Sequence, residues 1–427
     1  MEEILAASAL TLGRAIRARQ VSSTEVVAAY LRRIDQVNPA INAVVQRDDE
    51  RARAEANAAD EAVARGVTRG PFQGVPFTVK DIFDVAGVVS AAGLTERATY
   101  IPDRDAVVIA RMRGTGAILL GKTNCPPGGT GVVTENPLYG ATRNPYDLAR
   151  SPSGSSGGEA AAIAAGASPL GLGSDSGGSI RTPAHSCGIA ALRPTVGRVP
   201  NTGAFDLPGG LTDPRSQIGP MSRRVEDLGP ALAIIAGVDW RDSGVIPVPL
   251  VDPTSVELAG LRVACYADDG MAPPTPETAR AVQDAGRALT DAGAVVEETR
   301  PPDLDQVWDI TLRYWRSTAL TGKEIERLML DWDQFRTTML GFVERYDLIL
   351  CPVADEPAVP LRVEGNGIYC LPYSLTGYPC AVVRAGTSPE GLPIGVQVVA
   401  RPWREDVALA AAGQIESTLG GWRPPPL

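Results

Sequence analysis

The stretch of sequence from Ser151 to Arg181 reads SPSGSSGGEAAAIAAGASPLGLGSDSGGSIR. Two loops rich in glycine and serine enclose an alanine-rich segment and a short apolar segment. A flexible linker has no reason to enclose apolar elements, so we interpret the loops as parts of a folded site around a packed helix and a packed strand. Glycine allows the backbone to approach a ligand closely, which makes this stretch the first candidate for a functional site.

Short apolar strands and amphipathic helices alternate on both sides of this stretch. The patterns predict a helix after the capping box of Ser22 and Glu25, and further helices over residues 48–65, 107–114, 225–235, 276–291 and 406–419. They predict strands over residues 74–83, 117–120, 261–266, 348–352 and 392–399. This alternation is typical of an α/β fold with a mixed or parallel sheet whose faces are covered by helices. We find no internal repeat and no domain boundary, so we expect residues 1–427 to form a single domain.

The composition excludes several classes of protein. Hydrophobic residues make up 44% and charged residues 21% of the 427 residues, a balance typical of globular proteins with a sizeable core. With 50 acidic and 40 basic residues the net charge is -10, so we expect neither nucleic acid nor an anionic membrane as a partner. No stretch approaches the roughly 20 apolar residues of a membrane-spanning helix. An acidic N-terminus and six cysteines without a CxxC pair predict a cytoplasmic protein with reduced thiols.

Histidine and lysine are rare in this chain. His185 is the only histidine, which excludes a metal site built from several histidines, so we expect no metal and no histidine-based acid–base system. The only lysines are Lys80, Lys122 and Lys323. A lysine can lose its proton when it is desolvated and then act as a base, whereas arginine stays protonated in proteins. Each lysine is therefore a candidate for catalysis.

Three familiar motifs do not fit this sequence. Residues 154–158 match the GxSxG pattern of α/β-hydrolases, but that motif needs a histidine far downstream, and His185 lies close by. Residues 116–123 match the P-loop pattern, but their middle is an apolar strand instead of an exposed phosphate-binding loop. No serine stands three residues before a lysine, which excludes the SxxK chemistry of penicillin-binding proteins.

A serine hydrolase that needs no histidine remains. It requires a neutral lysine as base, a serine hydroxyl that passes on the proton, a nucleophilic serine and backbone N–H groups as an oxyanion hole. Lys80 lies among apolar residues that we expect to desolvate it and lower its pKa. The alternative for Lys80 is a buried ion pair with Asp81 or Asp84.

Several segments of the chain resemble the amidase signature family of serine hydrolases. They are the run from Ser151 to Pro194, GVPFTVKD at 74–81, LGKTN at 120–124, GPMSRRVEDL at 219–228 and LPIGVQ at 392–397. The resemblance thins between about residues 240 and 345. It implies a single large α/β domain with a central mixed β-sheet covered by α-helices, and catalysis without a cofactor. The region 300–345 resembles shorter members of the family, including urethanases, which cleave aryl carbamates.

The resemblance also implies roles for individual residues. Ser179 matches the family's nucleophile, Ser155 matches the bridging serine held in a cis peptide after Gly154, and Lys80 matches the base. The N–H groups that match the oxyanion hole are those of Ser176, Gly177, Gly178 and Ser179. The supporting positions, which hydrogen-bond the loop and orient the triad, are Ser156, Ser174, Asp175 and Arg181. One departure is Ser153, where the family often has glycine, and it bears on the backbone angles of the loop.

The function that the resemblance implies is that of an amidase. It would hydrolyse C–N bonds of small amides or anilides through an acyl-enzyme, with esters and aryl carbamates (urethanes) as further substrates. A relay that returns a proton to the leaving amine suits amides, because amines leave poorly unless they are protonated. Two alternatives are the glutaminase (A) subunit of a tRNA-dependent amidotransferase and, from another class, a non-catalytic binding protein on the same fold. We expect a small-molecule amide, ester or carbamate as the partner, and a monomer or homodimer.

Other conspicuous residues have a structural interpretation. We expect His185 to pack a loop, Lys122 to pack in a turn at a strand end, and Lys323 to lie on a helix surface. Aromatic residues recur at helical spacings between Trp308 and Phe342, a pattern that is more often core than pocket, although some of these rings could line an apolar acyl or aryl site. Tyr369, Cys370 and Tyr373 follow a glycine-containing loop that could also border the site.

Overall fold

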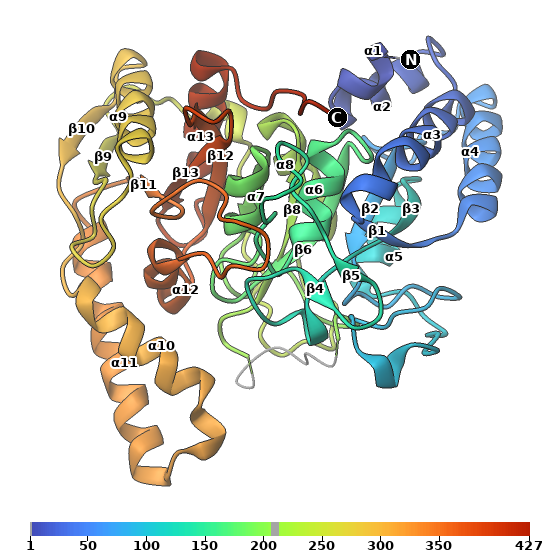
Figure 1. Cartoon of the computed structure of the whole chain (residues 1–427). Helices are drawn as coiled ribbons and strands as arrows, with labels where there is room; N and C mark the ends of the chain where they lie inside the picture. Colours follow the sequence, from blue (N-terminus) through green and yellow to red (C-terminus); the bar gives the residue numbers. More distant parts are fainter. Residues whose placement is uncertain (1, 206–212) are drawn as a thin grey trace.

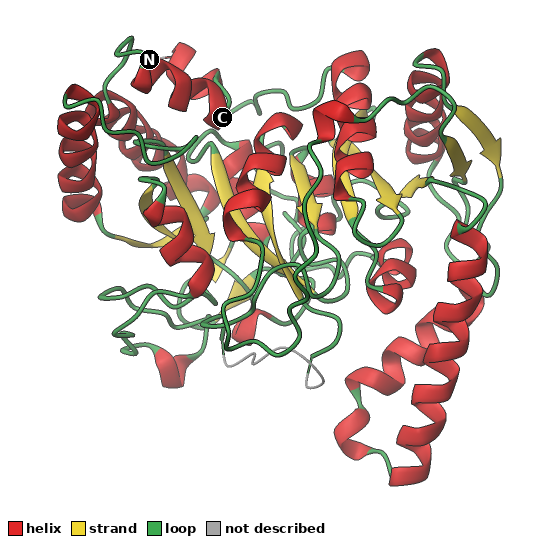
Figure 2. Cartoon of the chain, turned by 180° about the vertical axis from the view of Figure 1, so that it is seen from behind, coloured by secondary structure: helices red, strands yellow, loops and turns green. Residues whose placement is uncertain are grey.

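A computed structural model describes residues 2–205 and 213–427, and its centre is one large β-sheet. The sheet has eleven strands in the order β1-β3-β2-β6-β8-β7-β12-β13-β11-β9-β10. The strands are β1 (Val44–Arg47), β2 (Pro76–Lys80), β3 (Ile118–Thr123), β6 (Leu170–Asp175), β7 (Ala190–Arg193), β8 (Gln217–Ser222), β9 (Arg262–Cys265), β10 (Val295–Glu298), β11 (Leu348–Pro352), β12 (Cys380–Thr387) and β13 (Pro393–Ala400). The short strands β4 (Glu135–Asn136) and β5 (Gly140–Ala141) form a separate hairpin. Helices cover both faces of the large sheet (Figure 1 and Figure 2).

The sheet combines parallel and antiparallel pairs. β2 pairs in parallel with β3 and β6, and β9 pairs in parallel with β10 and β11. Between these two groups the chain pairs antiparallel, from β6 through β8, β7, β12 and β13 to β11. β2, β3, β11 and β13 are buried along their whole length, as strands covered on both faces are. The predicted α/β fold with a central mixed sheet covered by helices is confirmed, and its single continuous large sheet supports the proposal of one domain over 1–427.

Thirteen α-helices lie in the described residues. They are α1 (Glu2–Ala6), α2 (Ala9–Arg17), α3 (Ser23–Ile41), α4 (Asp49–Ala64), α5 (Val107–Gly114), α6 (Gly157–Ala164), α7 (Arg181–Cys187), α8 (Leu228–Ile235), α9 (Pro276–Asp291), α10 (Val307–Trp315), α11 (Gly322–Val343), α12 (Leu371–Thr376) and α13 (Glu405–Leu419). The predicted helices over 107–114 and 276–291 coincide with α5 and α9, and the capping box of Ser22 and Glu25 begins α3. None of these helices is both long enough and apolar enough to cross a membrane.

The alanine-rich helix α6 packs in the middle of the fold. All eight of its residues are buried, and small side chains let the neighbouring elements come close. A Cβ on Gly158 would lie 2.4 Å from the backbone oxygen of Asn124, so this position fits only glycine. The glycine and alanine content of the segment after Ser156 therefore follows from the close packing of α6.

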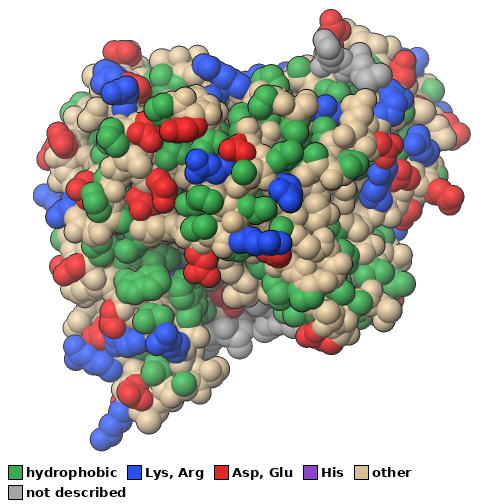
Figure 3. All heavy atoms as spheres, viewed as in Figure 1, with side chains coloured by type: hydrophobic (Ala, Val, Ile, Leu, Met, Phe, Trp, Pro, Cys, Tyr) green, Lys and Arg blue, Asp and Glu red, His purple; other side chains and the backbone are tan. Residues whose placement is uncertain are grey.

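Helices α10 and α11 form a hairpin that projects from the body of the protein (Figure 1). α11 buries one face, which carries Trp332, Phe335 and Phe342, in agreement with the prediction of aromatic core residues. The prediction is wrong for Trp308 and Trp315 of α10, which are 49% and 50% exposed. Figure 3 shows hydrophobic side chains at the surface around this hairpin. A short helix on a projecting hairpin has neighbours on one side only, so helical spacing does not tell core from surface there.

Several elements differ from the prediction. Lys122 lies inside β3 and not in a turn, because β3 runs three residues beyond the predicted 117–120 while pairing with both β1 and β2. The sequence patterns do not predict β7, β8, β12 or α12. His185 packs as predicted, but from helix α7 and not from a loop.

Candidate active site

Three segments that are distant in sequence meet at one edge of the sheet. β2 and β6 are parallel neighbours, with Val79 opposite Leu172, so their carboxyl ends point to the same edge. β2 ends at Lys80, β6 leads into the loop from Ser176 to Ser179, and the loop before α6 carries Ser155. A parallel pair thus brings the lysine and both serine loops together, in agreement with the placement expected for ligands at the carboxyl ends of strands.

Lys80 is completely buried and directed at hydroxyl groups. Its Nζ lies 2.6 Å from Ser155 Oγ and 2.9 Å from Ser174 Oγ, with the carbonyl oxygen of Gly129 at 3.4 Å. Burial lowers the pKa of Lys80 to about 8, against the weaker opposing effect of Cys125 and Asp175. A substantial fraction of the side chain is therefore neutral near neutral pH, and a neutral amine can accept a proton from Ser155.

The alternative of an ion pair for Lys80 is wrong. Asp81 pairs with Lys122, whose Nζ lies 2.9 Å from its carboxylate, and Asp84 lies 3.8 Å from Arg97. Within the described parts of the chain, Lys80 takes part in no ion pair. The second buried lysine thus satisfies the carboxylate next to Lys80, which leaves Lys80 free for the serines.

The loop before α6 has an unusual backbone. The peptide bond between Gly154 and Ser155 is cis, as the resemblance implies, and Ser153 has a φ of 64°, in the left-handed region. A Cβ on Gly154 would lie within 3.0 Å of backbone atoms of Gly131 and Val132, so no side chain fits there. In this loop Ser155 Oγ lies next to Lys80 Nζ.

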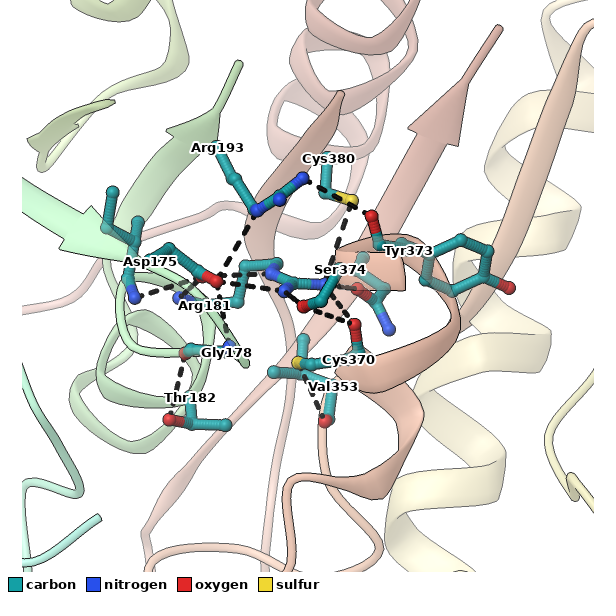
Figure 4. A network of polar contacts seen from close by, with 12 residues as sticks. Asp175, Gly178, Arg181, Thr182, Arg193, Val353, Cys370, Tyr373, Ser374 and Cys380 are labelled. Atoms are coloured by element: carbon teal, nitrogen blue, oxygen red, sulfur yellow. Dashed lines mark hydrogen bonds and ion pairs between the residues drawn. The ribbon is translucent and has the colours of Figure 1, made fainter. Parts of the chain in front are cut away.

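The loop after β6 is held by a buried carboxylate. Asp175 accepts hydrogen bonds from the N–H groups of Gly178 (2.8 Å) and Ile180 (3.1 Å), and Arg181 donates to it from Nε over 2.9 Å (Figure 4). Burial by itself raises the pKa of this carboxyl group, but Arg181, Arg193 and the N–H donors together hold it well below its usual range. Asp175 is therefore ionised and fixes the turn that carries Ser179.

Arg181 connects this turn to a second layer of the protein. It donates to Ser374 Oγ over 2.7 Å and to the carbonyl oxygen of Cys370 over 2.9 Å (Figure 4). Ser156 joins the two serine loops, since its N–H donates to the carbonyl oxygen of Ser179 over 3.1 Å. The predicted supporting residues thus surround the loops, and Ser174 also contacts Lys80.

The predicted oxyanion donors differ in their availability. The N–H of Gly178 donates to Asp175 over 2.8 Å, and its role toward an oxyanion stays a prediction. Within residues 2–205 and 213–427, the N–H groups of Ser176, Gly177 and Ser179 donate no hydrogen bond. A carboxylate below the turn draws the Gly178 N–H inward, an effect that the sequence pattern alone does not reveal.

A cavity of about 40 Å³ adjoins Ser179 and has room for a small group or a water molecule. The serine loops contribute Ser153, Gly154, Gly177 and Gly178 to its lining, helix α7 contributes Thr182, and the segment after β11 contributes Asp355, Glu356, Asn366 and Gly367. The glycine-containing loop before Tyr369 borders the cavity as predicted, whereas the sequence patterns do not single out Asp355 and Glu356. The available signal for those two residues was their position shortly after a buried strand, where polar residues often line sites.

Two other polar residues lie outside the cavity. His185 is buried, with Nδ1 against the backbone of Gly395 and Nε2 3.0 Å from the carbonyl oxygen of Glu356. Lys323 lies exposed on α11, as predicted. Among the described residues, no group of three or more histidine, cysteine, aspartate or glutamate side chains could hold a metal ion.

Comparisons with known proteins agree with this geometry. A family model for Amidase matches residues 25–327 and 317–409. The chain is 32% identical to an acylamidase of Rhodococcus erythropolis over 96% of this chain and 95% of the relative. It is 32% identical to the A subunit of the Glutamyl-tRNA(Gln) amidotransferase of Moorella thermoacetica, over 97% of both chains. The crystal structure of a bacterial aryl acylamidase of the amidase signature family superposes with a TM-score of 0.85, at 27% identity over 96% of each chain.

Proposed function

The chain belongs to the amidase family and is an enzyme that hydrolyses C–N bonds, and we propose that Ser179 is its nucleophile and that Ser155 and Lys80 relay the proton. The observation that carries this proposal is the 2.6 Å contact between Lys80 Nζ and Ser155 Oγ in a fully buried setting. A base of this kind must be neutral to work, and burial lowers the pKa of Lys80 far enough for that.

The proposed reaction proceeds in two steps. Neutral Lys80 takes the proton of Ser155, Ser155 takes that of Ser179, and Ser179 Oγ attacks the substrate carbonyl carbon. The C–N bond then breaks as the relay returns a proton to the leaving amine, and an acyl group stays on Ser179. Water attacks this ester in the second step, with the same relay removing its proton, and Ser179 is released with the carboxylic acid product.

We assign the oxyanion hole to fewer donors than the resemblance implies. The N–H groups of Ser176, Gly177 and Ser179 remain for the developing negative charge, because Asp175 occupies the N–H of Gly178. The Asp175 contacts then have a different role, which is to hold the loop in the shape that presents the other donors. No cofactor enters the proposed reaction.

The proposed substrates are small amides and anilides, with esters and aryl carbamates as further substrates. Similarity to proteins named acylamidase and aryl acylamidase supports this class. A serine nucleophile with a lysine-driven relay is chemically suited to all of these carbonyl groups, because each forms the same kind of acyl-enzyme or carbamoyl-enzyme ester. We propose that the enzyme acts as a monomer or homodimer and without nucleic acid. All six cysteines are free thiols, which supports a cytoplasmic location.

The test is the release of 4-nitroaniline from a simple 4-nitroanilide and from a matched N-(4-nitrophenyl) carbamate. We expect wild-type turnover of at least one substrate, its loss in Ser179→Ala, and full retention in Ser417→Ala, which alters an exposed serine of α13. A serine-directed phosphonate should label wild type and not Ser179→Ala. Turnover that survives in Ser179→Ala would disprove the assignment of the nucleophile.

The second candidate function is that of a glutaminase within an amidotransferase complex. It is favoured by the similarity to the A subunit of the Moorella thermoacetica amidotransferase, which covers 97% of both chains. That function predicts release of ammonia from glutamine and copurification with partner proteins. Ammonia release from glutamine without turnover of either anilide or carbamate would favour it over the independent amidase. If a folded wild type turned over none of these substrates and did not react with the phosphonate, the non-catalytic binding protein would be the better interpretation.

A further inference from the structure

Arg215 is a buried arginine whose side-chain nitrogens have no hydrogen-bond partner among the residues that the structure describes. It is completely buried, like Arg181, Arg193, Arg198 and Arg223. Each of those four donates to carboxylate, carbonyl or hydroxyl oxygens. By contrast, within residues 2–205 and 213–427 the three side-chain nitrogens of Arg215 have no hydrogen-bond partner, and no carboxylate there lies within ion-pair distance of them. An unpaired buried charge is costly, so its retention calls for a ligand or a function.

The guanidinium lies directly beside the loop that carries the proposed nucleophile. Arg215 Nη2 is 3.9 Å from the position that a Cβ on Gly177 would occupy. Gly177 also lines the cavity next to Ser179. Gly177, which has no side chain, therefore adjoins both the guanidinium and the cavity next to Ser179.

Two aromatic rings of α10 lie beside the guanidinium of Arg215. Its Cζ lies 5.0 Å from the ring centre of Tyr314 and 5.6 Å from that of Trp315. Such contacts offset only part of the cost of desolvation. Burial lowers the pKa of Arg215 to about 10, so the group is still protonated at neutral pH. Trp315 is half exposed, and its ring also approaches Gly177.

The nearest acidic residues do not neutralise this charge directly. Asp213 accepts from the N–H of Ser216 over 3.0 Å and from the hydroxyl of Tyr314 over 3.4 Å. Asp175 is occupied by Arg181 and by the N–H of Gly178. Both carboxylates thus bind other donors, and neither accepts a hydrogen bond from the guanidinium of Arg215.

We propose that Arg215 binds a carboxylate group of the substrate, so that the preferred substrates are half-amides of short dicarboxylic acids. This inference rests on the proposed function and narrows its substrate class. A guanidinium binds a carboxylate through two parallel hydrogen bonds, which fixes both the position and the orientation of the bound acid. With the scissile carbonyl at Ser179 and the carboxylate at Arg215, the substrate would pass Gly177, which lines the cavity and lies beside the guanidinium. The proposal therefore includes a short spacer, such as two methylene groups, between the two carbonyl carbons.

The test compares the 4-nitroanilides of succinic acid and butyric acid. These substrates share the leaving group and chain length and differ only in a terminal carboxylate or methyl group. A charge-assisted hydrogen bond predicts that wild-type kcat/KM favours the succinic substrate by about 10- to 100-fold. In Arg215→Met we expect this ratio to fall to one or below. Arg316→Met, which removes an exposed arginine next to Trp315, should keep the wild-type ratio.

Binding measurements test the same inference without turnover. Succinate should bind wild type in a calorimetric titration, whereas its uncharged diamide should bind at least tenfold more weakly. Arg215→Lys, which keeps the charge but loses the fork of donors, should bind succinate with intermediate affinity, and it serves in place of Arg215→Met if that variant does not fold. A wild-type ratio of one or below, or equal binding of succinate and its diamide, would overturn the proposal. Succinate binding that depends on Arg215 without turnover of either anilide would support the proposal and argue against the proposed amidase substrates.

Discussion

Lys80 Nζ lies 2.6 Å from Ser155 Oγ, and no carboxylate in the described residues neutralises the lysine. The pair is buried, so the position of the shared proton depends on the low dielectric and on the few hydroxyl groups nearby. In the proposed mechanism the activity of the enzyme therefore depends on the fraction of Lys80 that is neutral.

The first prediction concerns pH. Because only neutral Lys80 accepts a proton, kcat/KM should rise about tenfold per pH unit at low pH and level off above its pKa of about 8. Lys80→Arg stays protonated and should lose at least about 100-fold in kcat/KM. Lys323→Arg on the surface of α11 is the control and should leave the profile unchanged. A flat profile between pH 6 and 9 would contradict this role for Lys80.

The second prediction concerns the carboxylate below the nucleophile loop. Asp175→Asn removes one charge and leaves Arg181 and Arg193 buried without it, so we expect a loss of about 3 to 5 kcal/mol in the free energy of unfolding. Because the pKa of Asp175 is depressed in the folded protein, its stabilising effect is present above about pH 4 and is lost as the pH falls further. Urea titrations at pH 7 measure the loss. Asp309→Asn in a largely exposed ion pair should cost at most about 1 kcal/mol.

The third prediction concerns Glu159, which is buried in α6. Thr78 and Thr123 donate to its carboxyl group, yet burial raises the pKa of Glu159 to about 8. The folded state therefore holds a proton that the unfolded chain releases near pH 4.5, and this group's contribution to stability is present below that pH and is lost as the pH rises to 8.

Glu159→Gln retains the shape and cannot ionise, so it should gain stability over wild type on going from pH 5 to pH 8. The gain should be on the order of 2 to 4 kcal/mol, measured by urea unfolding at the two pH values. Glu61→Gln, an exposed change on α4, should show no such dependence. An equal difference between Glu159→Gln and wild type at both pH values would show that Glu159 is ionised when buried.

The fourth prediction concerns Ser153 in the loop before Ser155. Its φ of 64° lies in the left-handed region, where a β-branched residue is strained. Ser153→Val should lower the free energy of unfolding by about 2 kcal/mol, whereas Ser153→Gly should change it by less than about 1 kcal/mol, because relief of strain and the entropy of glycine oppose each other. Thermal unfolding of both variants beside wild type measures the difference. A valine variant as stable as the glycine variant would be the contrary result.

Local patterns predicted much of this molecule from its sequence. Local sequence was enough to predict the two serine loops, the strand that contains Lys80 and the helix α9. Each of these elements is formed by one short, continuous stretch of chain. The pairing of β2 with β6 then follows once the sheet is assumed, because Lys80 and the loop after β6 both stand at strand ends.

Contacts between distant segments could not be predicted in this way. The role of Lys122 in β3 depends on Asp81, the residue that follows β2, and the N–H of Gly178 donates to a carboxylate that a pattern of glycines does not reveal. Arg215 is a sharper case, because its significance lies in the partners that it lacks. A sequence shows which hydrogen-bond donors a side chain carries, but it does not show whether those donors have partners in the folded protein.

The groups that we propose to break the bond and the aromatic rings beside Arg215 come from different parts of the chain. The proposed bond-breaking groups come from the sheet and the serine loops, whereas the rings beside Arg215 and Gly177 come from the continuous segment 307–343, which projects from the body (Figure 1). Replacement of this segment by another of similar length would leave the proposed catalytic groups in place and change the rings beside Arg215. The substrate preference of this enzyme could therefore be altered by replacing this one continuous segment, without a change to the proposed catalytic residues.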